Sequence, residues 1–575
     1  MFLKKVEITK YRHLENIEIN FEKSQFPATF SIASVNGGGK STILQFIFIL
    51  LRCFRDENRK NFIKNLLGYT KKIKSKTKLA SFVIEEMEQD YDLEFIIVPT
   101  QDEERDFHCF LDIKEVKEQL EKAKQQKKRD ETILELKNEL EARNRVTPLM
   151  RKKIEKMVGY GINDSWGGIL AKFDNSNAQE REIYLNIKDS NNAEAYHELL
   201  DFIANKPPSS SIFSITTEED TIRDVKELES IYSDVQEKVE NLSDKLKDEN
   251  TIYISQLANT QNVLLLKTNM PQNILNELPN KLFLNTPKSQ AFLFLTLEEK
   301  ARIFNNTHDL SMENSSSFIS YDEAVESAKN NLEGFFTYDF ASTDLISSAF
   351  DKAFERDKQE KLETGVYGKH YDNLTEELSH FLNHKEISFD GKTGEVYFKQ
   401  TDTKEQLLPE ELSHGELKRL GIYIWLKYIV EPDSIVLMDE IDIALHPKWQ
   451  YQITKDLKKW SDNCQFLLAT HSPQILSSTY YKNLVVLELS DGKVKAVQFN
   501  KPPIDRDINT IITEIMGAPD LPTDLLNKHQ KYRKLVDEGR IDSEEAKELK
   551  REILEYESEN SAFFQEINFD LELMQ

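Results

Sequence analysis

The feature that most constrains the fold is a glycine-rich segment between an apolar strand and an apolar helix. Phe30–Ala33 is predicted as a short strand and Ile43–Leu51 as a helix that is apolar on every side, and Ser34-Val-Asn-Gly-Gly-Gly-Lys-Ser41 lies between them. This order is typical of a phosphate-binding loop, in which backbone N–H groups wrap a phosphate and the helix N-terminus adds partial positive charge. A glycine-rich surface turn is the alternative.

In such a loop Lys40 would reach the β- and γ-phosphate oxygens of ATP, and Ser41 would ligate Mg²⁺. Glycines are needed because side chains would block the approach of the phosphates to the backbone. The first glycine of the common G-x-x-x-x-G-K-S pattern is replaced by Ser34, at the tightest part of the turn. The predicted nucleotide-binding residues are Asn36, Gly37, Gly38, Gly39, Lys40, Ser41 and Thr42.

A pair of adjacent acids follows a second apolar strand far downstream. Ile435-Val-Leu-Met438 and Phe466-Leu-Leu-Ala469 are wholly apolar runs, as in parallel strands covered on both faces, so we expect an α/β fold. The first run ends at Asp439 and Glu440. Asp439 would hold Mg²⁺ through water, and Glu440 would orient or deprotonate the attacking water. Two acids that merely cap a turn are the alternative.

Together with three further motifs, these segments resemble the ATP-binding-cassette (ABC) ATPases of the SMC and OLD kind. Leu412-Ser-His-Gly-Glu416 is similar to their signature loop, Asp442-Ile-Ala-Leu-His-Pro447 to their D-loop and Thr470-His471-Ser-Pro to their switch histidine, all in the family's order. The resemblance implies ATP and Mg²⁺ as ligands. It further implies that Ser413 and Gly415 contact the γ-phosphate bound to the other subunit, and that Glu440 and His471 are catalytic, His471 sensing that phosphate. The alternatives are a helix N-cap for Ser413 and a satisfied loop histidine for His471.

The resemblance also implies that two chains share each ATP. The family's signature loop lies too far from the phosphate-binding loop of its own chain, and this sequence has one copy of each. A head-to-tail homodimer, or a higher even oligomer, would contain two composite sites that exclude water when closed. The sequence does not place the family's glutamine loop, for which Gln89 and Gln101 are weak candidates. Arg12, in a turn that resembles the family's N-terminal loop, could contact phosphate or be solvated.

The predicted organisation is an ABC-type ATPase head split by a mostly helical insertion. We expect residues 1–114 to form lobe I, 115–385 the insertion, 386–505 lobe II and 506–575 a C-terminal helical region that docks a partner. Glu115–Arg145 contains no glycine or proline and predicts a long exposed helix. The C-terminal region has a capping-box pattern that starts at Asp542. Phe107–Ile113 has a strand-like composition, and Glu182–Ile187 or Leu282–Phe294 could return a strand to lobe I.

Charge and cysteine content narrow the classes of function. The 100 Asp and Glu residues outnumber the 75 Lys and Arg residues, so the net charge of −25 disfavours general binding to nucleic acid or anionic membranes. Three widely separated cysteines exclude a disulfide scaffold and a CxxC metal hook, and they fit a reducing cytoplasm. No apolar run approaches the length of a membrane span. A cytoplasmic protein without membrane contact is expected.

Elimination within the resembled family leaves one branch. The span between the ATPase halves is too short for the coiled coils of SMC and zinc-hook proteins. The OLD and Gabija nucleases carry a Toprim domain with an Asp-x-Asp set at strand ends, whereas Asp505-Arg-Asp507 follows Pro502-Pro503 and no buried strand. We therefore expect no built-in nuclease. What is left resembles the Septu anti-phage defence ATPases (PtuA), also found beside some retrons, with support from Arg506-Asp-Ile-Asn509 and Ile515-Met516-Gly517.

That resemblance implies a small HNH nuclease of the PtuB type as partner, and a retron reverse transcriptase with its RNA–DNA as a further one. The C-terminal region from Glu552 contains seven acidic residues and no Lys or Arg, so its apolar residues could dock a protein. Packing onto the ATPase itself is the alternative. These apolar residues are Phe563, Phe564, Ile567, Phe569, Leu571 and Leu573.

The predicted insertion helix carries the opposite charge signal, a short basic run. This run could contact phosphates, which would make nucleic-acid binding sensitive to salt. Because acids flank it, an ordinary solvated face is the more favoured interpretation. Its residues are Lys122, Lys124, Lys127, Lys128 and Arg129.

Three functions compete on this sequence. The first is an ATP-hydrolysing subunit that regulates an antiviral nuclease by dimerising, and the second is an autonomous DNA-repair or chromosome-maintenance ATPase that clamps DNA. A DNA clamp needs an extended basic surface, which a chain of this net charge with one basic run does not offer. The third is a nucleotide-stabilised scaffold with weak turnover.

Overall fold

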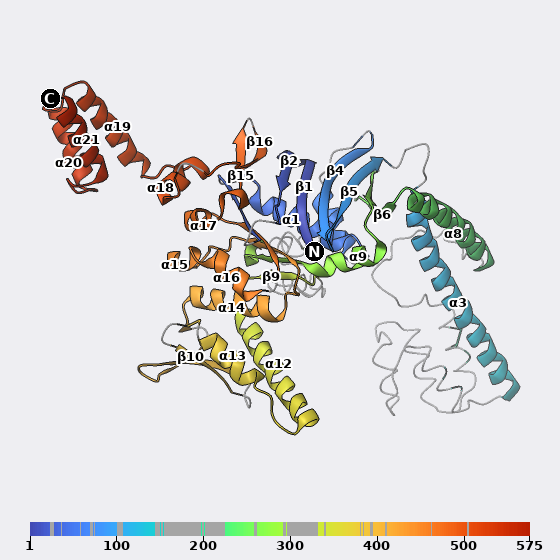
Figure 1. The fold of residues 1–575 in the computed structure, drawn as a ribbon. Coiled ribbons are helices and arrows are strands. Elements are labelled where there is room, and N and C mark those ends of the chain that lie inside the picture. Colours follow the sequence, from blue (N-terminus) through green and yellow to red (C-terminus); the bar gives the residue numbers. More distant parts are fainter. Residues whose placement is uncertain are drawn as a thin grey trace, which may run out of the picture. The chain divides into compact units, whose positions relative to one another are not determined.

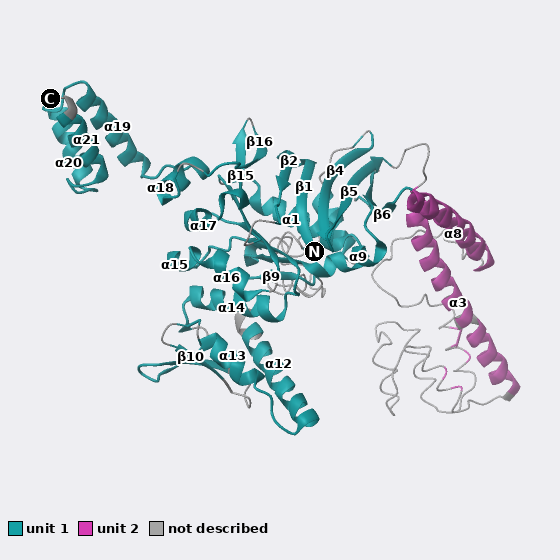
Figure 2. Ribbon diagram, in the orientation of Figure 1, with its two compact units in different colours: residues 1–99, 249–575 teal, residues 100–248 magenta. Residues whose placement is uncertain are grey.

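The structure is a computed structural model of the 575-residue chain, and it describes residues 1–99, 107–143, 225–290 and 332–574. Within these ranges it leaves gaps at 24–27, 36, 58, 69–72, 74, 258–261, 339–340, 380, 383–384, 391–394, 409–410, 462, 491 and 503–504, and outside them it describes Met150, Lys153, His197, Leu200, Asp201 and Leu295 singly. The described chain divides into two compact units, residues 1–99 with 249–575 and residues 100–248 (Figure 2).

The first unit is built on one large mixed sheet, of which one half is antiparallel. Side chains along β1 alternate between the core and the surface, with Val6 and Ile8 buried and Lys5 and Glu7 partly exposed, as expected of a strand with one solvated face. The strands of this half are β1 (Phe2–Tyr11), β2 (Leu14–Asn20), β4 (Thr77–Glu86), β5 (Gln89–Pro99), β6 (Thr251–Gln256) and β7 (Asn262–Thr268).

The other half of the sheet is parallel. Its strands are β3 (Thr29–Ser34), β8 (Leu282–Thr286), β9 (Phe335–Thr337), β13 (Ile435–Asp439), β14 (Gln465–Ala469) and β15 (Leu484–Ser490), and β16 (Lys493–Gln498) forms an antiparallel hairpin with β15. In the described residues the sheet order is β6-β7-β5-β4-β1-β2-β16-β15-β3-β14-β13-β8-β9. The strands β3, β14 and β13 are therefore parallel neighbours, and their carboxyl ends meet at one edge of the sheet.

The central parallel strands are buried on both faces because two different cores cover them. Every residue of β13 is buried, and its side chains alternate between these cores. Ile435 and Leu437 pack in the core that contains α1 (Lys40–Cys53), whereas Val436 and Met438 pack in the core that contains α14 (His414–Tyr428). This explains the wholly apolar runs of the sequence and confirms the predicted α/β fold with a parallel sheet.

Further short helices cover these two cores. They are α2 (Lys60–Leu67), α9 (Gln272–Glu277), α15 (Pro447–Gln450), α16 (Ile453–Trp460) and α17 (Pro473–Ser478), with 3₁₀ turns at Leu278–Lys281 and Tyr481–Asn483. Beside α14 lie α12 (Ala341–Thr364), α13 (His370–Ser379) and a separate antiparallel sheet of β10 (Lys385–Asp390), β11 (Glu395–Gln400) and β12 (Gln406–Leu407). In the described residues, no helix is long and apolar enough to cross a membrane.

The second unit contains a pair of long helices, α3 (Cys109–Arg143) and α8 (Val225–Asp248), which contact each other. The long helix predicted for Glu115–Arg145 is thus present, but it begins at Cys109. The strand expected at Phe107–Ile113 was wrong, because these residues form the first turns of α3 and a turn before it. In the described residues, the rest of the expected insertion up to residue 385 is not wholly helical, since β6, β7, β8 and β9 lie in it and join the main sheet. Residues 182–187, where a strand was also considered, lie outside the described residues.

The C-terminal region forms a small helical bundle of α19 (Thr523–Asp537), α20 (Glu544–Leu554) and α21 (Ala562–Met574), which has its own apolar core (Figure 1). The N-cap of α20 is Ser543, whose side chain accepts a hydrogen bond from the Ala546 N–H, so the helix begins one residue later than the pattern at Asp542 indicated. Two short helical segments, α18 (Ile508–Thr510) and a π-helical turn at Ile511–Ile515, precede the bundle.

The segment before the bundle is attached to α17 and to the sheet. The Arg506 guanidinium donates hydrogen bonds to the carbonyl oxygens of Leu476, Ser477 and Thr479, at the end of α17. Ile511 and Ile515 pack with Ala33 and other apolar residues of the sheet, so the packed part of the first unit extends past residue 505. This differs from the boundary between lobe II and the C-terminal region that the sequence suggested.

Candidate functional site

The glycine-rich loop follows β3 and leads directly into α1. Gly37 and Gly39 have φ angles of 78° and 91°, in the left-handed region that favours glycine. A Cβ atom on Gly38 would lie 2.5 Å from the Ser34 side chain, and one on Gly39 would lie 2.8 Å from Nε2 of His13. The loop therefore needs all three glycines, and the α1 N-terminus, with Gly39 as N-cap, faces the loop. Asn36 lies outside the described residues.

Ser34, the departure from the common loop pattern, has a defined contact. The Lys40 ammonium donates a hydrogen bond of 2.9 Å to Ser34 Oγ, which in turn donates to the Val35 carbonyl at 2.7 Å. Burial lowers the pKa of Lys40, and the nearby carboxylates Asp439, Asp442 and Glu440 act in the opposite direction. Lys40 is therefore held over the loop, close to the acidic residues of β13.

Asp439 ends β13 next to this lysine and is 1% exposed. Burial raises the pKa of its carboxyl, although Ser41, Gln290 and Lys40 nearby lower it. Within the described part of the chain, neither carboxylate oxygen has a hydrogen-bond partner of good geometry. A buried carboxylate without such a partner, beside the Ser41 hydroxyl and a lysine, is a donor set that suits a hard cation such as Mg²⁺.

Glu440 begins the turn after β13 in a left-handed conformation, with φ of 50°. Its N–H donates to the Ala469 carbonyl of β14 at 2.9 Å. Burial and the neighbouring charges of Asp439 and Asp442 raise the pKa of the Glu440 carboxyl. A raised pKa in a half-buried glutamate is suited to a general base.

The D-loop and the switch loop are joined by Asp442. Its carboxylate accepts a hydrogen bond of 2.6 Å from Thr470 Oγ1 and one of 3.3 Å from the N–H of His471. Burial, followed by the charge of Lys40, lowers the pKa of His471. The switch histidine therefore lies in the same charge cluster as Lys40, Asp442 and Glu440.

The signature loop begins α14. Ser413 is the N-cap, and it forms a complete capping box with Glu416, so the alternative role foreseen for this serine is present. A Cβ atom on Gly415 would lie 2.5 Å from the Ala444 carbonyl oxygen, so only glycine allows the signature loop to pack this closely on the D-loop. The N–H groups at the start of α14 can still face a phosphate brought by another chain.

Two residues of this site were missed by the sequence analysis. Gln290, in a short turn after β8, lies beside Asp439 and accepts a hydrogen bond of 2.7 Å from Gln45 of α1. Gln290 is therefore a glutamine that the structure brings to Asp439. Gln89 is instead exposed at the start of β5, and Gln101 lies outside the described residues. The sequence around Gln290 gives no local signal, since Asn-Thr-Pro-Lys-Ser separates this glutamine from the apolar residues of β8.

His13 is the second missed residue. Its Nε2 is buried without a hydrogen-bond partner in the described residues, and it lies against Gly39 of the loop. Arg12 is exposed in the same β1–β2 turn, over the ring of Tyr11. The turn that resembled the N-terminal loop of the family thus brings its histidine, rather than its arginine, to the glycine-rich loop.

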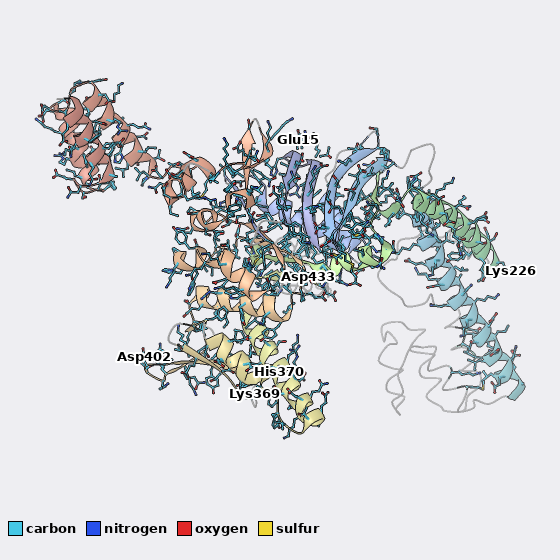
Figure 3. The ribbon with its side chains drawn as sticks, in the orientation of Figure 1. Glu15, Lys226, Lys369, His370, Asp402 and Asp433 are labelled. Carbon is cyan, nitrogen blue, oxygen red and sulfur yellow. The ribbon has the colours of Figure 1, made fainter. Side chains whose placement is uncertain are left out.

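A second group of potential metal ligands lies between α12 and α13. Ligand atoms of Asp357, Glu360 and His370 all lie within 4.8 Å of one another, and His370 marks the start of α13 in Figure 3. The Asp357 carboxylate accepts hydrogen bonds from the N–H groups of His370 and Tyr371, at 2.7 and 3.0 Å. This aspartate therefore caps α13, which accounts for its burial.

The apolar residues expected to dock a partner are divided by the bundle. Phe564 and Ile567 lie in its own core, and Phe563 stacks on His529 with ring centroids 3.8 Å apart. Phe569 is 60% exposed. Leu571 is partly buried against the same core, and the side chain of Leu573 lies outside the described part. Most of the predicted surface is therefore internal to the bundle.

The basic run lies on α3 of the second unit. Lys122, Lys124, Lys127 and Lys128 are exposed, and Lys124 forms an ion pair of 2.7 Å with Glu229 of α8. The side chain of Arg129 is not among those described. The three cysteines, Cys53, Cys109 and Cys464, are buried, and no disulfide joins them.

The family model described as "AAA domain, putative AbiEii toxin, Type IV TA system" matches residues 162–477, which is more than half of the chain. This span contains the signature loop, Asp439, Glu440 and His471, whereas the glycine-rich loop precedes it.

Relatives with similar sequences come from bacteria. "Retron Vc95 probable ATPase" of Vibrio cholerae serotype O1 biovar El Tor is 33% identical over 122 residues, which are 20% of this chain and 24% of the relative. "Septu protein PtuA" of Bacillus mycoides (strain KBAB4) is 28% identical over 190 residues, which are 31% of this chain and 26% of the relative. The chain thus matches about a quarter of the length of these curated relatives.

Among solved structures, the crystal structure of the Smc head domain with a coiled coil and joint derived from Pyrococcus yayanosii is aligned with 87% of this chain and 97% of its own, at 14% identity and a TM-score of 0.28. The family match covers most of the motifs on which the resemblance was based. The chain belongs to the family described as "AAA domain, putative AbiEii toxin, Type IV TA system", as an SMC/OLD-like ATPase that resembles the Septu protein PtuA and the retron ATPases.

Proposed function

We propose that this chain binds ATP with Mg²⁺ and hydrolyses it, as the ATPase subunit of a bacterial anti-phage defence complex. The observation that carries the proposal is the buried carboxylate of Asp439, which has no hydrogen-bond partner of good geometry among the described residues and lies beside Ser41, Gln290 and Lys40. Such a group is costly to keep in an apolar core unless it binds a ligand there. Ser41 and Asp439 would hold Mg²⁺, which supplies charge neutralisation between the phosphates when it is bound.

The phosphates of ATP would lie on the loop of Gly37, Gly38 and Gly39, at the N-terminus of α1. Lys40 would leave Ser34 for the β- and γ-phosphate oxygens, and Thr42 extends the first turn of the helix in the same region. Glu440 would then orient the attacking water and accept its proton, for which its raised pKa is suited. His471 would contact the γ-phosphate from the switch loop.

A second copy of the chain would complete the site. Ser413 and Gly415 begin a helix whose N-terminus can accept a phosphate, and the family resemblance places that phosphate on the partner protomer. A head-to-tail homodimer would then close over two ATP molecules and exclude water from both. We propose Asp442 as the link between this closure and the switch loop, since it already binds Thr470 and the N–H of His471.

The defence role is supported by the names of the relatives, a retron ATPase and a Septu protein. On this basis we propose that the partner is an HNH nuclease of the PtuB type, and that ATP-dependent dimerisation holds or releases it. A retron reverse transcriptase with its RNA–DNA is the further candidate partner. The exposed lysines of α3 are a candidate contact with nucleic acid.

The test of the enzymatic proposal compares the wild type with Glu440→Gln. We expect Mg²⁺-dependent phosphate release by the wild type, and a rate lower by roughly 10²–10⁴-fold in the variant. ATP affinity should be retained, and the variant should form an ATP-dependent dimer that gel filtration detects. Equal rates in the two proteins would contradict the proposal and favour a nucleotide-stabilised scaffold.

The test of the defence proposal uses the chain expressed together with its neighbouring genes. Cells that carry the wild type should survive phage challenge better than cells that carry Lys40→Ala, and an HNH nuclease should co-purify with both proteins. Equal phage titres on the two strains would argue against an ATP-dependent defence role. Purification without a nuclease would remove the proposed partner but leave the ATPase proposal intact.

A further inference from the structure

A buried lysine connects the signature helix to the turn that carries Glu440. Lys418 lies in the second turn of α14, is 6% exposed, and donates hydrogen bonds to the carbonyl oxygens of Glu440 at 3.1 Å and Ile443 at 2.9 Å. Its ammonium also lies 3.7 Å from the centroid of the Tyr338 ring. These three contacts surround an amino group that is largely shielded from water, and burial lowers its pKa to about 7.

The partners of Lys418 are unusual for a buried cation. Among the described residues no carboxylate forms an ion pair with it, and its contacts are two backbone carbonyls and an aromatic face. Burying an ammonium is unfavourable, and here the negative charges of Asp442 and Glu440 compensate only from a distance. A methionine of similar length would avoid that cost, so the stability of the fold alone does not explain a lysine at this position.

The two carbonyls lie at both ends of the turn that follows β13. Glu440 and Ala444 both have left-handed backbone conformations, with φ of 50° and 64°, which are unfavourable for residues that carry a Cβ atom. The Glu440 carbonyl also accepts a hydrogen bond from the Ile443 N–H at 3.2 Å. Lys418 therefore clamps a turn that has little intrinsic stability and that sets the direction of the Glu440 side chain.

The same helix reaches this turn a second time through the signature loop. Gly415 packs directly on the Ala444 carbonyl, and Gly415 and Lys418 are three residues apart, on one face of α14. The body of α14 is fixed to its surroundings by Trp425, which stacks on Phe336. A movement of the signature loop therefore reaches the turn through two adjacent contacts, one steric and one by hydrogen bonds.

We propose that Lys418 is a positioning residue, which holds the Glu440 turn in its catalytic geometry and transmits engagement of Ser413 by the partner's ATP to the hydrolytic centre of its own chain. This inference rests on the proposed ATP hydrolysis and deepens it. Lys418 itself does not contact ATP. Because it acts through the backbone of the turn, its loss should reduce turnover and leave ATP binding unchanged.

The experiment compares Lys418→Met with Lys418→Arg in the full-length chain. Methionine matches the length of lysine but cannot donate, and we expect its kcat to fall on the order of 10²-fold with KM for ATP unchanged, as for a misplaced catalytic group. Arginine retains donors for both carbonyls and should recover most of the rate. If the methionine variant does not fold, Lys418→Gln, which keeps one donor, should show an intermediate kcat.

Arg419→Met is the matched control. Arg419 is the next cation of α14, with an ion pair of 2.9 Å to Asp456 and a place over the rings of Trp449 and Trp460, and no hydrogen bond to the turn is found for it among the described residues. This variant should lower the melting temperature without lowering kcat. The inference would be overturned if, in Lys418→Met and Arg419→Met alike, kcat fell in proportion to the melting temperature. Such a result would indicate a merely structural role for Lys418.

The outcomes also separate the inference from the proposed function. A wild type that binds ATP but never hydrolyses it would refute both. A wild type that hydrolyses ATP, together with a Lys418→Met protein of equal kcat, would refute the positioning role alone.

Discussion

Replacing Asp439 by asparagine should stabilise the nucleotide-free protein while it weakens the response to MgATP. The Asp439 carboxylate is 1% exposed, and neither oxygen has a hydrogen-bond partner of good geometry in the described chain. An unsatisfied buried polar group costs about 1–3 kcal/mol, and a charged one more. Asparagine has the same shape without the charge, and its NH₂ group can donate to Ser41 or Gln290 nearby. We therefore expect a gain of at least ~1 kcal/mol in the free energy of unfolding.

The assay is thermal unfolding with and without MgATP at pH 7.5. Each kcal/mol of added stability raises the melting temperature of a domain of moderate size by about 2–4 °C. At a ligand concentration of 100 times Kd, the wild type should gain about 2.7 kcal/mol from binding. The Asp439→Asn variant should gain much less free energy of unfolding from MgATP. The difference in stability between the two proteins should therefore shrink or change sign when MgATP is added.

The pH dependence of stability gives an independent check that the charge of Asp439 destabilises the nucleotide-free protein. Burial raises the pKa of Asp439 in the folded state above its ordinary value of 3.8, so the folded protein binds a proton more readily than the unfolded chain. The free energy of unfolding of the wild type is therefore reduced at pH values above the folded-state pKa. This reduction is lost as the pH falls from that pKa towards 3.8. The advantage of Asp439→Asn should shrink in the same direction.

Asp442→Asn serves as the control of opposite sign. The Asp442 carboxylate accepts hydrogen bonds from Thr470 and from the His471 N–H, so removal of its charge should lower the melting temperature. The reasoning would be refuted if Asp439→Asn were less stable than the wild type without nucleotide, because the carboxylate would then have a structural role.

Three further predictions concern the loop, the catalytic glutamate and the bundle. Ser34→Gly removes the hydrogen bond that holds Lys40, so ATP should bind roughly tenfold more tightly in calorimetry. The reason is that hydrogen bonds to charged groups contribute about 1.5–3 kcal/mol, of which the greater backbone freedom of glycine offsets about 0.5–1 kcal/mol. Weaker binding of ATP by the variant would contradict this prediction. Because the pKa of Glu440 is raised, kcat at saturating MgATP should fall on acidification with a midpoint above 4.5, and a rate that is flat across pH 5–7 in a protein saturated with MgATP would indicate another base. Phe564→Ala should destabilise the bundle by about 3–5 kcal/mol in limited proteolysis without changing the ATPase rate, whereas the exposed Phe569→Ala should leave both unchanged.

The nucleotide-binding edge could be predicted because its residues obey local rules. A strand, three glycines, Lys40 and an apolar helix follow one another directly, and the buried run before Asp439 needs only its own composition to be recognised. The predicted resemblance to SMC/OLD-like and Septu ATPases is confirmed by the family match and the relatives. Motifs that are contiguous in sequence can therefore be recognised without knowledge of the fold, and the roles predicted for their residues remain predictions.

The rest depends on contacts between distant segments. Gln290 meets Asp439 only because β8 pairs with β13, a parallel pairing that no local pattern encodes. In the sequence, Lys418 looks like a solvated helix residue. It is buried only because α14 packs on the turn after β13, a contact between segments that are not adjacent in the sequence. Phe107–Ile113 has the composition of a strand, but it forms the start of a long helix, where tertiary context overrides β-propensity.

The hydrogen bonds of Arg506 have a consequence for how the C-terminal bundle is connected. The guanidinium closes the open carbonyl end of α17, the helix that begins directly after His471 and Ser472. If a protein bound to the bundle and displaced it, the displacement would therefore act first on the C-terminal end of α17, and not on a free linker. A chain shortened at residue 505 would lose this anchor together with Ile511 and Ile515, and would expose the apolar patch around Ala33, one residue before the phosphate-binding loop.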